Sequence, residues 1–464
     1  MVSPLARALL RASKLPAANL CHTTTPRLYS AIVARPCSVA PALVGSRRAF
    51  SSTSDISTSD ASVATSTSAT SASEAEANKP RASLADPSSY AFVFDIDGVL
   101  LRSSEPIPGA KEALRFLHDN NIPFVLLTNG GGKSEAERAA DLSAKLDVPI
   151  SPDNFVQSHT PFMGLVDGPE GLRDKTVLVT GSDAAKCREI AESYGFKNVI
   201  IPADIIQANP DIFPFNHLME QVYKDTARPL PSPMWLGKAG NSPMDRHLKI
   251  DAVFVFNDPR DWALDTQIII DLMSSYQGYL GSYSTKNGKA ALPNKGWYAD
   301  NQPTIYYSNP DMIWATTYHQ PRLGQGAFQA ALAGIWHRIT GGQKMRSQTF
   351  GKPNKIAYTY AEEALMAHRE EVLARGGLEV GKHPKLKSVY MVGDNLRSDI
   401  LGANTFESSD GTAWTSILVK TGVTNVANLK KNEGNAIPKG IADDVKAAVQ
   451  WALDREGIDA EGKL

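Results

Sequence analysis

From residue 90 onward, short apolar runs alternate with amphipathic segments. Rich in Val, Ile, Leu, Phe and Tyr and bounded by Gly, Pro, Asn or Asp, the runs are typical of buried strands. They cover 90–94, 123–128, 155–158, 176–181, 198–202, 251–256, 304–308, 385–392 and 416–419. Between them, apolar residues recur at helical spacing in 110–120, 133–146, 183–194, 326–340, 353–375 and 442–455. This alternation predicts an α/β fold.

The regular spacing of strands and helices is interrupted in the middle of the chain, which predicts an inserted domain. We expect a core whose first part is 90–165, an inserted α/β domain at 166–322, and the second part of the core at 323–464. Within the insertion, the Pro-rich stretch 209–245 is expected to be irregular. The pair Gly324-x-Gly326 imitates a dinucleotide fingerprint, but no strand leads into it.

The first 89 residues have a different composition. Residues 1–54 contain no Asp or Glu but carry several Arg and Lys, and four leucines can share one face of a basic helix. This predicts a mitochondrial transit peptide over 1–50, with a merely basic tail as the alternative. The Ser-, Thr- and Ala-rich residues 51–89 have too little apolar surface to fold and are expected to be a linker.

Overall composition excludes several classes of function. The formal net charge is −1, so there is no global case for nucleic-acid binding. No apolar run is long enough to predict a transmembrane segment. The three cysteines argue against a disulfide scaffold or a zinc site. No pattern sets the oligomeric state.

The first candidate for chemistry is the end of the run 90–94. Asp95 and Asp97 follow it, and Gly98 lets the chain turn. Two carboxylates this close to apolar residues are costly unless a cation neutralises them or one stays protonated, and Mg²⁺ is the hard cation that carboxylates prefer. The alternative is a strand end followed by an acidic turn.

The second candidate is the glycine-rich loop that begins with Thr128, Asn129 and Gly130. A strand, a glycine-rich loop and a helix together form a phosphate-binding arrangement, because loop amides and the helix N-terminus face the anion. The loop is not a P-loop, since Leu127 stands where that motif requires glycine. A turn without a ligand is the alternative.

Further polar signatures occur later in the chain. Lys352 precedes a helix and is expected to face a shared cleft, and Asp394, Asn395 and Asp399 follow the run 385–392. Parallel sheets bind ligands at the carboxyl ends of their strands, so these groups are expected to converge with the first two candidates. In the insertion, Asp258, Arg260 and Trp262 are candidates for substrate specificity, but for Trp262 a place in the domain core is favoured.

These motifs resemble those of the haloacid dehalogenase-like (HAD) hydrolases. The matching segments are D-I-D-G-V at Asp95, L-L-T-N at Thr128, G-K-P at Lys352 and G-D-N-L-R-S-D-I from Asp394 to Asp399. The resemblance covers about 90–464. The position of the insertion is similar to the family's type-two cap of subfamily IIA. The T-N-G-G-G variant, the long cap and the N-terminus most resemble the mitochondrial branch named after the cat eye syndrome critical region protein five.

The resemblance implies a Rossmann-like parallel-sheet core and a set of catalytic roles. Asp95 is the implied nucleophile, forming an aspartyl-phosphate, and Asp97 the implied general acid and base. Lys352 is implied to assist catalysis and, with Thr128, to hold phosphoryl oxygens.

The implied phosphate-binding residues also include Asn129 and Gly130, and the implied cofactor is Mg²⁺. Asp95, Asp394 and the Asp97 carbonyl are its implied ligands. Asn395 and Asp399 are implied to hold these ligands in position without binding the ion themselves.

The expected function is that of a Mg²⁺-dependent phosphohydrolase acting on a small phosphomonoester in the mitochondrial matrix. One alternative is a phosphatase of the mitochondrial glycerophospholipid pathway. Another is a non-catalytic scaffold that binds a phosphorylated metabolite. The presence of both Asp95 and Asp97 argues against the scaffold, which needs no such pair.

Overall fold

The structure is a computed structural model. It describes residues 89–168, 171–215, 219–237, 244–314, 316, 318–379, 381, 383–424, 434–458, 460 and 464. The predicted transit peptide and all but the last residue of the predicted linker lie outside these residues.

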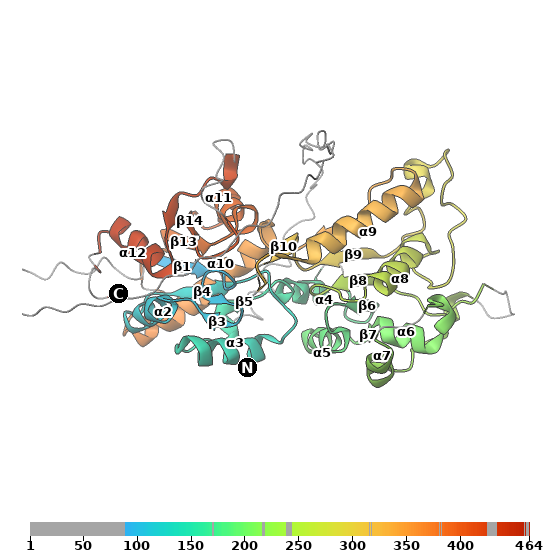
Figure 1. Ribbon diagram of the computed structural model, residues 1–464, viewed down its shortest axis with the longest axis horizontal. Helices are drawn as coiled ribbons and strands as arrows, with labels where there is room; N and C mark the ends of the chain where they lie inside the picture. Colours follow the sequence, from blue (N-terminus) through green and yellow to red (C-terminus); the bar gives the residue numbers. More distant parts are fainter. Residues whose placement is uncertain are drawn as a thin grey trace, which may run out of the picture. The chain divides into compact units, whose positions relative to one another are not determined.

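The first sheet has six strands in the order β15-β14-β13-β1-β4-β5, and every paired neighbour is parallel (Figure 1). Its strands are β1 (Tyr90–Phe94), β4 (Phe124–Leu127), β5 (Phe155–Val156), β13 (Ser388–Gly393), β14 (Ala413–Val419) and β15 (Gly440–Ala442). The central strand β1 therefore pairs with β13, although the two lie far apart in the sequence. This pairing brings the first and last motifs to one edge of the sheet.

Helices cover both faces of the first sheet. Successive side chains of a strand point to opposite faces of the sheet. Phe92 therefore belongs to the apolar cluster on one face, and Val93 belongs to the cluster on the other. The first cluster includes residues of α2 (Ala110–Asp119), α3 (Glu135–Leu146) and α12 (Val445–Arg455). The second includes residues of α10 (Lys355–Arg375) and α11 (Leu401–Thr405). Burial on both faces explains why these strands read as continuous apolar runs rather than alternating ones.

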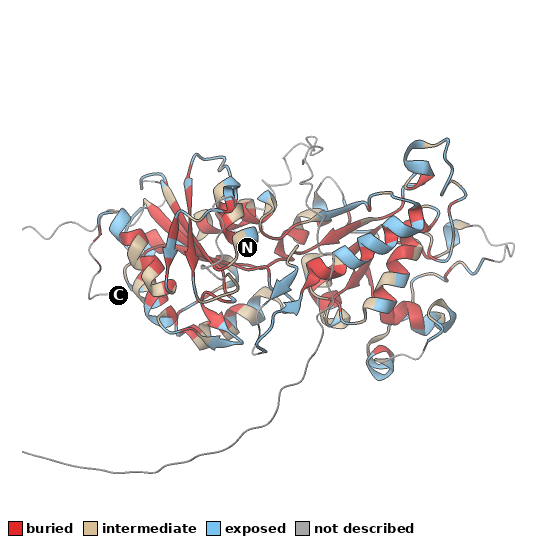
Figure 2. Ribbon diagram, turned by 45° about the horizontal axis from the view of Figure 1, so that its top comes forward, coloured by how far each residue is buried: buried red, intermediate tan, exposed pale blue. Residues whose placement is uncertain are grey.

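The second sheet has five parallel strands in the order β12-β9-β8-β6-β7. They are β6 (Thr176–Thr180), β7 (Asn198–Ile200), β8 (Ala252–Val255), β9 (Thr304–Tyr307) and β12 (Ser347–Thr349). Among the helices of this part are α4 (Gly164–Asp167), α5 (Ala184–Tyr194), α6 (Pro202–Ala208), α7 (Glu220–Thr226), α8 (Trp262–Ser274) and α9 (Gln325–Thr340). Figure 2 shows the strands of both sheets as buried. The predicted α/β fold class, a parallel-sheet core with an inserted α/β domain, is confirmed, and the sheet of the inserted domain is parallel as well.

The second sheet extends beyond the predicted end of the insertion at residue 322. Strand β12 pairs with β9, and Phe328 and Trp336 of α9 lie in the apolar cluster of the second sheet. The helix that we expected to open the second part of the core therefore belongs to the inserted cap. Local apolar spacing predicted this helix, but it carries no information about which sheet the helix packs on.

Two short hairpins complete the described fold. Strands β2 (Leu101–Arg102) and β3 (Glu105–Pro106) follow the turn at Gly98. Strands β10 (Ile313–Trp314) and β11 (Arg322–Leu323) form an antiparallel pair immediately before α9. Among the described residues, no helix combines the length and apolar character that crossing a membrane requires.

Candidate active site

Asp95 lies directly after β1, at the carboxyl edge of the first sheet. Its side chain is nearly buried, and burial is the main reason why the pKa of its carboxyl is raised well above the usual value; the nearby Lys352 ammonium acts in the opposite direction. The chain turns away at Gly98, whose φ is +93°. A Cβ at Gly98 would lie 2.4 Å from Oδ2 of Asp394, so glycine is required here both for the turn and for the close approach.

The ammonium group of Lys352 lies among three acceptors from separate parts of the chain. Its Nζ is 2.7 Å from Oδ1 of Asp95 and 2.6 Å from Oδ1 of Asp399, and it donates to the Leu127 carbonyl oxygen at 2.8 Å. Burial lowers the pKa of Lys352, but the carboxylates of Asp399 and Asp95 more than offset this, so its net pKa lies above the ordinary value. The side chain is therefore a fixed, buried positive charge beside Asp95.

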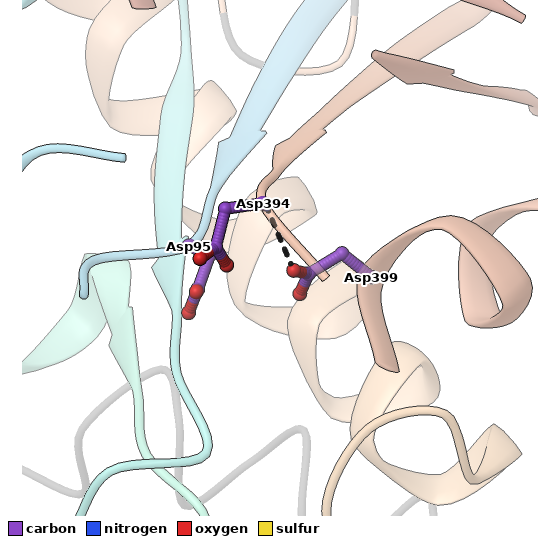
Figure 3. Close-up of side chains that lie close together, drawn as sticks. All are labelled: Asp95, Asp394 and Asp399. Carbon is purple, nitrogen blue, oxygen red and sulfur yellow. Dashed lines mark hydrogen bonds between the residues drawn. The ribbon is translucent and has the colours of Figure 1, made fainter. Parts of the chain in front are cut away.

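Asp394 and Asp399 come from the end of β13 and from the helical turn that follows it (Figure 3). Oδ2 of Asp399 accepts hydrogen bonds from the backbone N–H groups of Asp394 and Asn395, at 3.2 and 3.1 Å. Oδ2 of Asp394 accepts one from the Val423 N–H at 2.7 Å. Asp399 thus holds the backbone of the Asp394 turn, while the Asp394 carboxylate remains beside Asp95.

The donor set fits a hard divalent cation. Carboxylate oxygens of Asp95, Asp394 and Asp399 lie within 4.8 Å of one another, all three residues are buried, and one lysine contacts two of them. Burial, followed by the charge of Asp399, raises the pKa of Asp394 to about 7. Three buried carboxylates and one ammonium leave an excess of negative charge that a Mg²⁺ ion would relieve, and oxygen donors are the ligands that Mg²⁺ prefers.

The glycine-rich loop follows β4 and borders the same site. The Thr128 Oγ1 accepts a hydrogen bond from the Gly130 N–H at 2.9 Å. Asn129 Oδ1 accepts from the Lys352 N–H at 2.8 Å, and its Nδ2 donates to the Lys352 carbonyl oxygen and to Oδ2 of Asp311, both at 3.0 Å. The Asn129 amide is therefore engaged at both ends, and its contacts fix the backbone of Lys352.

Asp97 faces a cavity of about 330 Å³ at this edge of the sheet. Its side chain is accessible from the cavity, yet the surrounding protein atoms displace enough water to raise the pKa of its carboxyl; the cations Arg138 and Lys352 oppose that effect. A carboxyl group with a raised pKa that remains open to a cavity is suited to proton transfer.

Most of the predicted site residues line this one cavity. They are Asp95, Asp97, Thr128, Asn129, Gly130, Asp258, Arg260, Lys352, Asp394 and Asn395. Asp399 lies behind them, where it contacts Lys352. Trp262 does not line the cavity: its indole Nε1 donates to the Pro259 carbonyl oxygen, and its ring packs on Phe328 with centroids 5.5 Å apart. Trp262 therefore lies in the core of its own domain, which is the place favoured for it from the sequence.

Several lining residues escaped the sequence prediction. Asp311 follows β9, and its polar S-N-P-D loop is a strand-end signature of the kind used to find Asp95. Burial raises the pKa of Asp311 to about 6, while Asn129 and Lys352 act in the opposite direction. Val423 contributes a backbone N–H, which no side-chain motif could indicate. Ile313 and Trp314 of the hairpin also reach the cavity.

The comparisons with known proteins agree with this arrangement. A family model described as "Haloacid dehalogenase-like hydrolase" matches residues 92–197, and one described as "HAD-hydrolase-like" matches 349–448. The mitochondrial hydrolase YKR070W of Saccharomyces cerevisiae is 38% identical over 376 residues, which cover 79% of this chain and 96% of that protein. This chain belongs to the HAD-like hydrolase family. The predicted family and enzyme class, a hydrolase, are thereby confirmed.

Two further relatives show how far the likeness extends. The cardiolipin synthase (CMP-forming)/mitochondrial hydrolase fusion protein of Schizosaccharomyces pombe is 38% identical over 366 residues, covering 78% of this HAD-like chain and 53% of the fusion protein. The ribonucleotide monophosphatase NagD of Escherichia coli is 36% identical over 95 residues, covering 20% of this chain and 35% of that protein. The relatives that match most of this chain are thus described as mitochondrial hydrolases.

Proposed function

We propose that this HAD-like hydrolase is a Mg²⁺-dependent phosphatase that cleaves small phosphomonoesters through an aspartyl-phosphate intermediate. The observation that carries the proposal is the meeting of Asp95, Asp394 and Lys352 at one edge of the first sheet, beside the cavity that Asp97 lines. Phosphoryl transfer depends mainly on in-line positioning and on neutralised charge, and these residues supply both.

In the first half-reaction, a carboxylate oxygen of Asp95 attacks phosphorus. The new O–P bond forms as the ester O–P bond breaks, and the carboxyl of Asp97 gives its proton to the departing alkoxide. The raised pKa of Asp97 favours the protonated form that this step requires.

In the second half-reaction, water attacks the aspartyl-phosphate. The Asp97 carboxylate takes a proton from the water, and the O–P bond to Asp95 breaks, releasing phosphate and restoring both side chains. Throughout, the Lys352 ammonium and the Thr128 hydroxyl hold phosphoryl oxygens. Removing a group of this kind typically lowers the rate by about 10²–10³.

Asp95, Asp394 and the backbone carbonyl of Asp97 would hold the Mg²⁺ ion, which would supply charge neutralisation for the phosphoryl group. Asp399 would keep the Asp394 turn in place through its two backbone hydrogen bonds. A cavity rim that includes Lys133, Arg138 and Arg260 favours an anionic substrate. The E. coli relative's description as a ribonucleotide monophosphatase supports the substrate class.

The decisive experiment is a turnover screen of phosphomonoesters with the purified protein, with and without Mg²⁺. We expect phosphate release from at least one compound that requires Mg²⁺ and is abolished in Asp95→Asn. The screen includes lipid phosphomonoesters, because a fungal relative is fused to a cardiolipin synthase. Absence of turnover on every compound, with ligand binding unchanged in Asp95→Asn, would favour the non-catalytic scaffold.

We also propose the mitochondrial matrix as the site of action. The acid-free N-terminus and the mitochondrial relatives support this location. A fluorescent reporter fused to residues 1–50 should enter mitochondria. A reporter in which the basic residues of this segment are replaced by Gln is the control and should stay cytosolic. A diffuse signal from the unaltered fusion would contradict the proposal.

A further inference from the structure

Residues 312–361 contain no Asp or Glu. At the chain's average of 49 acidic residues in 464, a stretch of this length would carry about five. The stretch includes the hairpin β10–β11 and helix α9, which follow one another directly and contact each other. Its first part borders the cavity of the active site through Ile313 and Trp314.

The hairpin region exposes large apolar side chains. Met312, Ile313, Trp314, Tyr318 and Leu323 are each between 41% and 59% exposed. Such a concentration on one short segment is unusual for a surface that faces only water. Tryptophan and tyrosine beside aliphatic residues are the combination found where proteins meet the headgroup region of a bilayer.

The exposed face of α9 continues this pattern. Its residues are Ala330, Ala331, Ala333, Gly334, Ile335, His337, Arg338 and Ile339 (Figure 2). The solvent face of a helix in a water-soluble domain normally carries charged side chains of both signs. Here the charged side chain is Arg338, and the rest are small or aliphatic apart from His337. This composition is unusual for a helix face that contacts water alone.

A basic cluster lies at the C-terminal end of α9. Lys344 and Arg346 are exposed in the segment after the helix, and Lys295 reaches the same place by donating to the Gly341 carbonyl oxygen at 3.1 Å. The carboxylate of Asp300, near this end, is buried and paired with Lys286. Because 312–361 contain no Asp or Glu, α9 and the segment after it also contribute no carboxylate beside these basic side chains.

The chemistry of this surface distinguishes among the possible partners. A second copy in a twofold-symmetric dimer would bring the same surface, and so no carboxylates from α9 or the hairpin for Lys344 and Arg338. Nucleic acid would attract the basic side chains, but its interfaces with proteins are polar and would leave the exposed Ile, Leu and Met side chains without apolar contacts. An anionic bilayer offers both features, because its phosphates attract basic side chains and its interface accepts Ile, Leu, Met and Trp.

We propose that the cap docks on an anionic phospholipid bilayer through this surface, which we call the cap membrane face. It comprises residues 312–314, 316 and 318–323 together with the exposed side of α9 and Lys295, Lys344 and Arg346. Docking here would bring the mouth of the active-site cavity to the lipid surface, because Ile313 and Trp314 belong to both. The proposal concerns binding to the bilayer alone, so it stands or falls separately from the proposed catalysis.

The test is flotation of the full chain with phosphatidylcholine vesicles that do or do not contain phosphatidylglycerol. The wild type should float only with the anionic vesicles. Removing two surface charges in Arg338→Gln/Lys344→Gln should lower the partition coefficient about 30-fold. Ile339→Ser should lower it roughly fivefold.

Matched controls separate the effect of this face from general effects of removing surface charge or apolar area. Lys111→Gln/Lys175→Gln removes two exposed charges elsewhere, and Ile437→Ser changes an isoleucine that is 50% exposed, as Ile339 is. Both control variants should bind as the wild type does. Equal binding by the cap variants and the wild type, or no binding by the wild type, would overturn the proposal. So would a wild-type dimer that Ile339→Ser converts to monomer, because a second copy would then cover the face.

Discussion

At the scale of single residues, burial and chemistry are coupled most closely in the carboxyl groups of the site. Asp95, Asp97 and Asp394 all have raised pKa values, and in each the main cause is burial. A group of this kind is costly in its charged form until a cation neutralises it. Two predictions follow from the different surroundings of Asp97 and Asp394.

Asp97→Asn should lower kcat by about 10²–10⁴, because the amide of Asn cannot donate or accept the proton that the Asp97 carboxyl transfers in the proposed reaction. In the wild type, kcat should fall as pH rises through the pKa of Asp97, since only its protonated form can act as the acid. That limb of the pH profile should be absent from the variant. The matched control is Asp119→Asn, an exposed residue. Steady-state kinetics near wild type for Asp97→Asn would contradict the assignment.

Asp394→Ala should weaken Mg²⁺ binding in calorimetry, because it removes a proposed ligand. In the wild type, binding should strengthen as pH rises through about 7, because a protonated carboxyl is a poor ligand. The metal-free protein should show the opposite trend in stability. The pKa of Asp394 is higher in the folded than in the unfolded chain, so this contribution is full below about pH 4 and is lost as pH rises through about 7.

Thermal unfolding at a series of pH values, with and without Mg²⁺, measures that trend. The metal-free midpoint should fall between about pH 4 and pH 7 relative to the Asp394→Ala protein, and Mg²⁺ should raise it near pH 7. An unchanged binding isotherm in Asp394→Ala would argue against the ligand role.

At the scale of elements, the loop after β14 joins two parts of the site. Thr421 Oγ1 donates to the Gly98 carbonyl oxygen at 2.6 Å, and the Val423 N–H donates to Asp394 Oδ2 at 2.7 Å. Between them, a Cβ at Gly422 would lie only 1.8 Å from Oδ2 of Asp394. The loop therefore sets the position of the Asp394 carboxylate through backbone contacts alone.

Gly422→Ala should lower Mg²⁺ affinity about 10–100-fold, because the added methyl group must displace the Asp394 carboxylate or the loop. Calorimetry measures the affinity, and thermal unfolding shows whether the fold is retained. Gly334→Ala is the matched control, since its Cβ would meet no atom within 4 Å. Equal Mg²⁺ affinity in the two variants would contradict the role of this loop.

The comparison of sequence and structure is also clearest at the level of elements. Asp95, Thr128 and Asp394 could be found from the sequence because each follows an apolar strand, and parallel strands end at one edge. The same rule could have found Asp311 after β9. Helix α9 was predicted as a helix but assigned to the wrong domain. That error concerns long-range packing, which local periodicity does not encode.

At the scale of the whole molecule, one hydrogen bond connects the cap to the lysine of the core site. Asp311, after β9, accepts from Asn129 Nδ2, and the same Asn129 amide holds both backbone polar groups of Lys352. The side chain of Lys352 then contacts Asp95. This chain of contacts gives the cap a direct means of positioning the core site.

Asp311→Ala should lower kcat/KM about 10–100-fold, because it removes a charged acceptor from a buried amide. Asp311→Asn retains a carbonyl oxygen at this position and should keep most of the activity. The measurement is kcat and KM for both variants, with thermal unfolding to exclude global destabilisation. If Asp311→Ala behaves as the wild type does, the cap does not position Lys352 through this bond.

The sequence by itself determined the pattern of strands and helices, the α/β class and the residue types of the site. These follow from the local order of apolar and polar residues, which indicates the buried segments and the polar residues at the ends of the strands. Only the tertiary structure decided which sheet α9 and β12 join, that Asn129 holds Lys352, and that Val423 binds Asp394. Those outcomes depend on contacts between residues far apart in the chain, several of them made by backbone atoms that every residue shares.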